Sequence, residues 1–244
     1  MSEDTAAVAL GTMPDGLIPE LSLMMPAYNE EEILPIALEE AVAALKAQVT
    51  TWEIVVVDDG SSDRTPEILA EWAAREPRIR GVTNDPNRGY SQALIRGFHA
   101  CELAVVFYTD ADAQFDLMEM CRLYPLIADA DMVAGFRVGR QDPWFRLITS
   151  GVYNVIQGLV LGVRARDVNC AFKFFRRDFF EKVALSSDGF LIDAELYSRA
   201  DRAGLRWAQG PVTHRPRTEG VTTVKVGTIQ ETLRQLFALK KALK

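Results

Sequence analysis

The first half of the chain alternates short apolar segments with segments of helical periodicity. The apolar segments, which predict strands, are Leu21–Met25, Glu53–Val57, Ile79–Asn84 and Leu103–Thr109. The helical segments between them are Glu30–Gln48, a segment that starts at Thr65-Pro66, and Ser91–Ala100. The second apolar segment is almost continuous in β-branched residues, which is typical of a strand covered on both faces. This alternation predicts an α/β fold in which helices cover a mostly parallel central sheet.

Local signals also predict where two of the helices begin. Asn29 is followed three residues later by Glu32, which is the spacing of a capping box, and Pro35 is tolerable only near the first turns of a helix. Pro66 suits the first position of the next helix. We therefore expect the first helix to be capped by Asn29.

Polar residues follow three of the predicted strands, at residues 26–30, 58–63 and 110–114. The carboxyl ends of parallel strands meet at one edge of a sheet, which is where ligands of such folds bind. Asp110 and Asp112 lie two residues apart as their strand ends, so both carboxylates can turn toward one divalent cation. Such a cation keeps waters and takes phosphate oxygens as further ligands. A solvated turn would explain this pair alone, and the two neighbouring polar segments favour a metal site.

Composition limits the class of protein. The 244 residues, 48% of them hydrophobic, suffice for one large domain or two small ones, and one domain is the simpler interpretation because no linker-like tract divides them. The net charge of −7 argues against a nucleic-acid-binding protein. The cysteines Cys101, Cys121 and Cys170 are odd in number and lack CxxC spacing, which indicates reduced thiols in the cytosol and excludes a zinc cluster built on cysteine. The first residues lack the order of a signal peptide.

Two segments are candidates for contact with a membrane surface. The longest uncharged stretch, Leu147–Val163, is shorter than the ~20 residues of a spanning helix, and Trp144 and Phe145 precede it. Residues 227–244 have the spacing of an amphipathic helix that carries lysines. We expect a peripheral association with the cytoplasmic face of the membrane. Ordinary packing of both segments against the domain is the alternative.

Several motifs resemble those of the inverting family 2 glycosyltransferases with a GT-A fold, in particular polyprenyl-phosphate sugar transferases of the dolichol-phosphate mannose synthase type. The matching segments are Met25–Glu30, Val55–Thr65, Asn87–Tyr90, Thr109–Gln114, Asp167–Lys173, Pro211-Val212 and Arg217–Gly220. The resemblance implies a GT-A catalytic domain at residues 20–226 with a Rossmann-like nucleotide-binding half. A flexible lead-in at 1–19 would precede it, and the amphipathic helix at 227–244 would follow it.

The resemblance also implies roles for individual residues. The expected nucleotide-binding residues are Pro26, Tyr28, Glu30, Val57, Asp59, Asp110, Ala111 and Gln114. The expected ligands of a Mg²⁺ or Mn²⁺ ion are Asp110, Asp112 and Gln114, and this ion would neutralise the diphosphate leaving group. The expected catalytic residues are Asp112, Arg137, Asp193 and Arg217.

Arginines form a cluster before the uncharged stretch, at Arg137, Arg140 and Arg146. The planar fork of arginine suits phosphate oxygens, although ordinary surface arginines are the alternative. The two histidines, His99 and His214, are expected to be structural.

The acceptor distinguishes two enzymatic hypotheses. Transfer of a hexose to a hydroxyl group needs a general base, for which Asp193 or Glu195 is the candidate. A polyprenyl phosphate is already anionic and needs no base, and the arginine cluster favours this acceptor. GDP-mannose is the first donor to test and UDP-glucose the second. A third hypothesis is a nucleotide-sugar-binding sensor without turnover. The donor base and the oligomeric state do not follow from the sequence.

Overall fold

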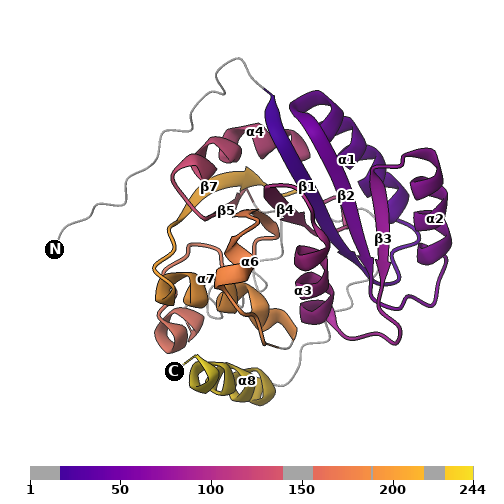
Figure 1. The fold of residues 1–244 in the computed structure, drawn as a ribbon. Helices are drawn as coiled ribbons and strands as arrows, with labels where there is room; N and C mark the ends of the chain where they lie inside the picture. The colour runs from indigo at the N-terminus through magenta and orange to yellow at the C-terminus, as the bar shows by residue number, and fades with distance from the viewer. Residues whose placement is uncertain (1–16, 140–155, 188, 217–228, 244) are drawn as a thin grey trace.

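A seven-stranded sheet forms the centre of the computed structural model, which describes residues 17–139, 156–187, 189–216 and 229–243 (Figure 1). The strands are β1 (Ile18–Ala27), β2 (Val49–Asp58), β3 (Ile79–Thr83), β4 (Val105–Thr109), β5 (Met132–Val138), β6 (Phe172–Arg176) and β7 (Trp207–Thr213). Their order across the sheet is β3-β2-β1-β4-β6-β5-β7. The strands β1 to β4 are parallel to one another, and β5 is parallel to β7, whereas β6 runs antiparallel between β4 and β5. The predicted mostly parallel sheet is confirmed.

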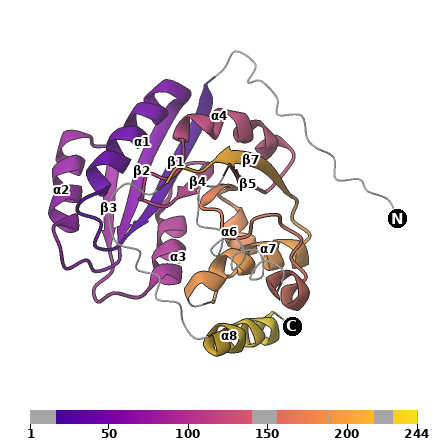
Figure 2. The same ribbon diagram turned by 180° about the vertical axis from the view of Figure 1, so that it is seen from behind.

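Helices cover both faces of this sheet, as predicted (Figures 1 and 2). The helices are α1 (Leu34–Gln48), α2 (Thr65–Arg75), α3 (Tyr90–Ala100), α4 (Met120–Leu123), α6 (Phe179–Lys182), α7 (Ile192–Arg202) and α8 (Ile229–Ala242), with short 3₁₀ turns η1 (Leu117–Glu119), η2 (Tyr124–Ala128) and η3 (Gly189–Leu191). Met24 of β1 lies against Gly97 of α3, whereas the next residue, Met25, lines a small cavity together with Ala37 of α1. Since successive strand residues point to opposite faces, α1 and α3 lie on opposite sides of the sheet.

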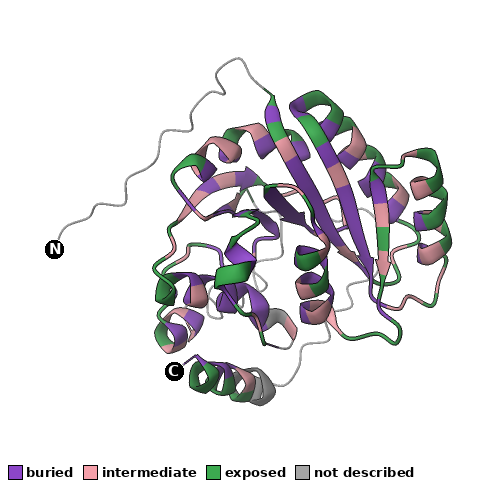
Figure 3. Cartoon of the chain, viewed as in Figure 1, coloured by how far each residue is buried: buried purple, intermediate pink, exposed green. Residues whose placement is uncertain are grey.

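The burial pattern follows from this layering. The central strands are buried along most of their length, and the helices expose their outer faces (Figure 3). In β2, every residue from Ile54 to Asp58 is buried, as expected for a strand covered on both faces.

The start of α1 differs from the prediction. The helix begins at Leu34, its N-cap residue is Ile33, and no side chain caps it, so the predicted capping box is wrong. Asn29 adopts a positive φ of 54°, and its side-chain oxygen accepts a hydrogen bond of 2.8 Å from the backbone N–H of Ser62. The side chain thus stabilises the neighbouring loop after β2. Helix α2 does start with a proline in its first turn, as predicted.

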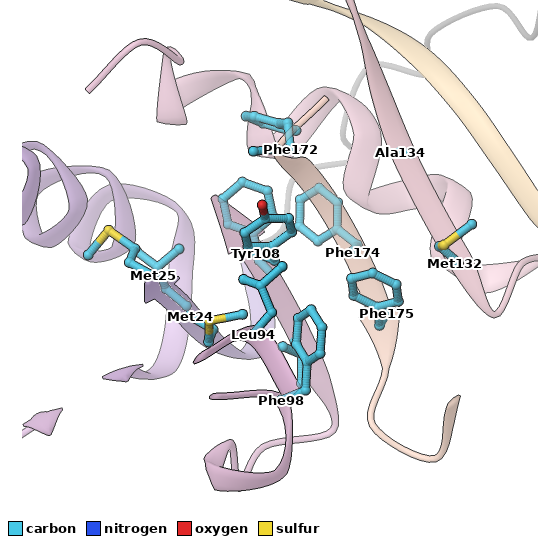
Figure 4. Close-up of a cluster of buried hydrophobic side chains, with 14 of the residues drawn as sticks. Met24, Met25, Leu94, Phe98, Tyr108, Met132, Ala134, Phe172, Phe174 and Phe175 are labelled. Carbon is cyan, nitrogen blue, oxygen red and sulfur yellow. The ribbon is translucent and has the colours of Figure 1, made fainter. Parts of the chain in front are cut away.

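Aromatic side chains pack in the core on both faces of β4 and β6 (Figure 4). Phe98 of α3 contacts Tyr108 edge-on, with ring centroids 5.9 Å apart, and stacks on Phe180 of α6 at 4.3 Å. On the other face, Phe107 of β4 packs against Phe174 of β6, with centroids 4.5 Å apart. This packing fixes β6 against β4 and therefore fixes the part of the sheet that carries the candidate site.

Helix α8 lies below α7 in Figure 1, and its residues Leu236 and Leu239, together with Leu243 just after it, are buried in the core. Its Phe237 is 57% exposed, so the helix packs one apolar face on the domain and leaves an aromatic ring outside. Within the described chain, no helix combines the length and apolarity that a membrane span requires.

The uncharged stretch is described only at its end, where residues 156–161 are helical and Leu159 is 80% exposed. Trp144 and Phe145 lie outside the described residues.

Candidate active site

The carboxyl ends of β1, β2 and β4 meet at one edge of the sheet, as the sequence predicts. Pro26 is the register partner of Val57, and the backbone N–H of Asp59 donates a 2.9 Å hydrogen bond to the carbonyl of Ala27. Tyr28 follows directly and is 41% exposed. The predicted nucleotide-binding residues of the first two polar segments therefore lie together at the ends of two adjacent parallel strands, although the side chain of Val57 is fully buried.

The loop after β1 is anchored to the loop after β2. The backbone N–H of Glu30 donates a 2.9 Å hydrogen bond to Oγ1 of Thr65, and the N–H of Glu31 donates one of 3.1 Å to Asp63. These contacts give Tyr28 and Glu30 a defined backbone position at the edge of the site.

The predicted metal ligand Asp110 lies beside two tyrosine hydroxyls. Its Oδ1 accepts hydrogen bonds of 3.2 Å from the hydroxyls of both Tyr90 and Tyr108, and these two hydroxyls also contact each other. Burial, together with the nearby carboxylates of Asp112 and Asp193, raises the pKa of the Asp110 carboxyl to about 7. A cation bound beside Asp110 would oppose this shift, because it favours the ionised carboxylate.

The rest of the predicted donor set lies in the same turn. The backbone N–H of Gln114 donates a 3.2 Å hydrogen bond to Oδ1 of Asp112, and its side-chain amide donates one of 3.0 Å to the carbonyl of Arg215. Two carboxylates and one amide oxygen on a single turn are ligands that Mg²⁺ or Mn²⁺ accepts. The donor set therefore fits a hard divalent cation.

A segment from the far end of the sheet holds this turn in place. The N–H of Arg215 donates a 2.7 Å hydrogen bond to the carbonyl of Gln114, and Phe115 forms a β-bridge with His214. The guanidinium of Arg215 also pairs with Glu40 of α1, at 3.1 Å. The contact between Gln114 and Arg215 was not predicted from the sequence, because these two residues are about 100 positions apart in the chain.

The carboxylate of Asp59 is buried and fully engaged within the protein. Its Oδ1 accepts hydrogen bonds from Nδ2 of Asn84 at 2.7 Å and from the N–H of Arg88 at 3.0 Å, and its Oδ2 accepts one from the N–H of Gly89 at 2.8 Å. The preceding residue, Asp58, keeps a buried Oδ2 that has no hydrogen-bond partner among the described residues. Asp59 thus fixes the turn before α3.

Asp193, the candidate base, forms a buried ion pair. Its Oδ1 lies 2.6 Å from Nζ of Lys173, which also donates a 2.6 Å hydrogen bond to the carbonyl of Cys170. The pair lies close enough to Asp110 for the carboxylate of Asp193 to raise that residue's pKa. Lys173 was not a predicted site residue, although a lysine within the run Phe172–Phe175 is a signal for a buried ion pair.

Glu195 belongs to a different environment from Asp193. Its side chain is completely buried and accepts hydrogen bonds from the backbone N–H groups of Ser186 and Ser187 and from Nε of Arg199. These contacts stabilise the connection between α6 and α7.

Arg137 forms a two-pronged ion pair. Its Nε and Nη2 lie 2.7 and 2.8 Å from the carboxylate of Asp167, within the motif Asp167–Lys173. The other predicted arginines, Arg140, Arg146 and Arg217, lie outside the described residues.

The histidines and cysteines lie in packed surroundings. The ring of His99 contacts Phe180, and that of His214 contacts Phe115. All three cysteines are free thiols, and burial raises the pKa of both Cys101 and Cys170 to about 12. These two thiols are therefore not nucleophiles at neutral pH.

Comparison with known sequences identifies the family. The profile described as Glycosyl transferase family 2 matches residues 22–184. An undecaprenyl-phosphate 4-deoxy-4-formamido-L-arabinose transferase from Pectobacterium carotovorum is 38% identical over 163 residues, which are 66% of this chain and 50% of that protein. Glycosyltransferase AglD from Haloferax volcanii is 32% identical over 208 residues, 81% of this chain and 33% of that protein. The chain thus spans half or less of the length of these two relatives.

Solved structures share the fold. Glucosyl-3-phosphoglycerate synthase from Mycobacterium tuberculosis in complex with phosphoglyceric acid superposes with a TM-score of 0.66 at 20% identity, covering 92% of this chain and 80% of that one. A mannosyltransferase from Pyrobaculum calidifontis in complex with GDP-Man and Mn²⁺ gives a TM-score of 0.61 at 21% identity, covering 92% and 65%. The chain therefore has the GT-A fold and belongs to glycosyl transferase family 2.

Proposed function

We propose that the protein transfers a hexose, with inversion, from a nucleoside-diphosphate sugar to a polyprenyl phosphate. The observation that carries the proposal is the juxtaposition of Asp110, Asp112 and Gln114 with the carboxyl ends of β1 and β2. Candidate ligands for a cation and candidate contacts for a nucleotide are thereby adjacent at one edge of the sheet, which supports a site where a diphosphate group would bridge them.

Asp110, Asp112 and Gln114 would hold a Mg²⁺ or Mn²⁺ ion, with oxygens of the donor diphosphate as further ligands. When bound, the cation supplies Lewis-acid stabilisation of the negative charge that develops on the departing nucleoside diphosphate. Residues of the chain would orient this group: Pro26, Tyr28 and the backbone of Val57 would flank the nucleotide, and Asp59, which holds the turn at Gly89, would support the same edge of the site.

The surroundings of the two candidate bases support a phosphate acceptor. Asp193 is ion-paired with Lys173, and Glu195 is engaged by the segment around Ser186. An acceptor hydroxyl would need one of these carboxylates free to take its proton, whereas a phosphate oxygen is already ionised at neutral pH. The similarity to a transferase that acts on undecaprenyl phosphate points the same way.

Such an acceptor lies in a membrane, so the protein would dock peripherally at the membrane surface. The exposed Leu159 and Phe237, with Lys240 and Lys241 beside the latter on α8, are the described side chains that suit the interface between headgroups and acyl chains.

The donor can be identified by thermal stabilisation. Ligands that bind the folded state raise its melting temperature, so the protein is heated with GDP-mannose and UDP-glucose, each with Mn²⁺ or with EDTA. Two structures with this fold contain these sugars together with Mn²⁺, which makes them the first donors to compare. We expect a Mn²⁺-dependent shift with one donor, lost in Asp112→Ala and kept in the exposed control Asp129→Ala. The absence of any shift in the wild type would contradict the proposal.

The acceptor is tested by supplying a polyprenyl phosphate and the polyprenol of the same chain length. We expect transfer to the phosphate and none to the alcohol. A general base contributes about 10²–10⁴-fold to a rate, so Asp193→Asn should lower transfer to the phosphate by less than ~10² if no base is needed. Transfer to the alcohol by the wild type would establish the hydroxyl acceptor instead. Donor binding without transfer to either would support the nucleotide-sugar sensor.

A further inference from the structure

We infer that Tyr90 and Tyr108 are positioning residues that present Asp110 to the cation through one carboxylate oxygen, and that Tyr90 couples cation binding to nucleotide binding. This inference rests on the proposed function, since it concerns how its metal site is built.

The first step is the geometry around the Asp110 carboxylate. Both phenol hydroxyls lie 3.2 Å from the same oxygen, Oδ1, and they come from different elements, Tyr108 from β4 and Tyr90 from the start of α3. Both hydroxyls lie at Oδ1, with two phenol protons shared among their contacts with this oxygen and with each other, so Oδ2 is the oxygen available to a cation. A carboxylate held in this way ligates through one oxygen and leaves the other coordination positions to waters and phosphates, which is what Mg²⁺ and Mn²⁺ require.

The two tyrosines differ in how rigidly they are held. Tyr108 is completely buried and lies in the middle of the sheet, opposite Met24 of β1 and Lys173 of β6. Its ring also packs edge-on against Phe98. Tyr108 therefore provides a fixed reference for Asp110, independent of the loops around the site.

Tyr90 connects Asp110 to the predicted nucleotide surface. The residue before it, Gly89, has a φ of +84° and donates its N–H to Oδ2 of Asp59 at 2.8 Å. The residue after it, Ser91, donates its hydroxyl to the carbonyl of Gly189 at 2.5 Å. A displacement of the turn held by Asp59 must consequently move Tyr90, and with it one of the two donors to Asp110.

This arrangement gives the two tyrosines separable effects. Loss of either hydroxyl should weaken the cation site, because hydrogen-bond partners of metal-ligating carboxylates typically contribute about 10–100-fold to metal affinity. A nucleoside diphosphate is expected to increase the affinity for the cation by some factor. Only the loss of the Tyr90 hydroxyl should also reduce this factor. By reciprocity, the same factor describes how the cation tightens nucleotide binding.

The experiment measures Mn²⁺ binding by electron paramagnetic resonance, with and without saturating GDP or UDP, in the wild type, Tyr90→Phe and Tyr108→Phe. Tyr124→Phe is the matched control, since its phenol lies in a groove with Val105 and Arg176, near the start of β4 and away from Asp110. We expect Mn²⁺ affinity to fall about 10–100-fold in both variants and to stay unchanged in the control. The turnover number at saturating Mn²⁺ should change far less than the Mn²⁺ concentration for half-maximal activity.

Wild-type Mn²⁺ affinity in both tyrosine variants would overturn the positioning role. An unchanged nucleotide effect in Tyr90→Phe, with weakened Mn²⁺ binding, would overturn the coupling role. If the wild type fails to bind Mn²⁺ both in the presence of GDP and in the presence of UDP, the proposed function fails and this inference fails with it. The melting temperatures of the variants, which keep both rings, show whether any loss reflects unfolding.

Discussion

Lys173 and Asp193 form a buried ion pair, with Nζ of the lysine 2.6 Å from Oδ1 of the aspartate. The side chain of Lys173 is 0% exposed and that of Asp193 is 5% exposed. The pair joins β6 to the first turn of α7, next to the β4 residue Tyr108, whose ring lies 5.8 Å from the ammonium group. A charge pair in such surroundings loses its hydration on folding and persists only where each partner compensates the other. The pair thus fixes α7 behind the strand that leads to Asp110.

Breaking this pair from the lysine side should strongly destabilise the fold. In Lys173→Met the carboxylate of Asp193 loses its partner, and we expect the free energy of unfolding to fall by about 3–5 kcal/mol. Urea denaturation measures this change. The double variant Lys173→Met, Asp193→Leu removes both charges and should recover much of the loss. Lys182→Met, which removes an exposed lysine, should leave the midpoint unchanged. A small effect in Lys173→Met would contradict the pair's structural role.

Glu195 should make the stability of the fold depend on pH in the acid range. Burial acts to raise the pKa of this carboxyl, but the hydrogen bonds from Ser187, Ser186 and Arg199 outweigh it, so the pKa lies below its usual 4.5. A group with a lowered folded-state pKa contributes stability above its unfolded pKa and loses it as pH falls through the folded one. The contribution is therefore complete above about pH 4.5 and is lost below it.

The isosteric variant Glu195→Gln tests this dependence. At pH 7 we expect a loss of about 1.5–3 kcal/mol in the free energy of unfolding, the usual contribution of hydrogen bonds to a charged group. The difference from the wild type should shrink as the pH falls below 4.5 in urea denaturation series. A difference independent of pH would show that packing, rather than the charge, is lost.

Asp59→Asn separates two roles for this residue, a direct contact with the nucleotide base and the support of the turn before α3. An asparagine amide would direct N–H groups toward Asn84 or Gly89, so we expect a stability loss of about 1–3 kcal/mol together with weaker GDP or UDP binding. Urea denaturation and nucleotide titration measure the two effects. The exposed residue Asp85 gives the control, Asp85→Asn. Weaker nucleotide binding at unchanged stability would favour the direct contact.

The strands and helices of the first half could be predicted because their signals are local. Runs such as Ile54–Val57 and the periodicity of residues 34–48 specify the element and its buried faces without reference to distant residues. The convergence of three strand ends at one edge followed from the parallel order alone. The predicted helix cap at Asn29 was wrong because a long-range contact replaces the local one. The side chain of Asn29 accepts a hydrogen bond from Ser62, 33 residues away, and does not cap helix α1.

Long-range pairing set the limit of prediction within the site. The antiparallel insertion of β6 between β4 and β5 depends on contacts between residues such as Phe107 and Phe174, which no local pattern specifies. No local pattern specifies the contact of Tyr90 and Tyr108 with Asp110, nor the hydrogen bond from Arg215 to Gln114. Motifs single out individual acidic residues as candidates, whereas the groups that orient these residues emerge only from the folded structure.

Gly97 lies where α3 approaches the sheet most closely, and its replacement by alanine tests this packing. An added Cβ would lie 2.7 Å from Cγ and Sδ of Met24 and 2.9 Å from a methyl group of Val57. The side chain of Val57 is β-branched and stiff, so relief requires a shift of the helix. We expect Gly97→Ala to lower the free energy of unfolding by about 1–3 kcal/mol, the usual cost of overpacking a core.

Gly81→Ala is a matched control for this prediction. Its added Cβ would come as close, 2.8 Å, but to a terminal methyl of Leu69 on α2, which can rotate away. The cost should therefore be smaller, although the nominal overlap is similar. Because α3 begins at Tyr90, a shift of the helix in Gly97→Ala should also weaken Mn²⁺ binding, whereas Gly81→Ala should not. Equal stability losses in the two variants would show that α3 moves as easily as a leucine side chain, and would contradict a rigid helix behind the metal site.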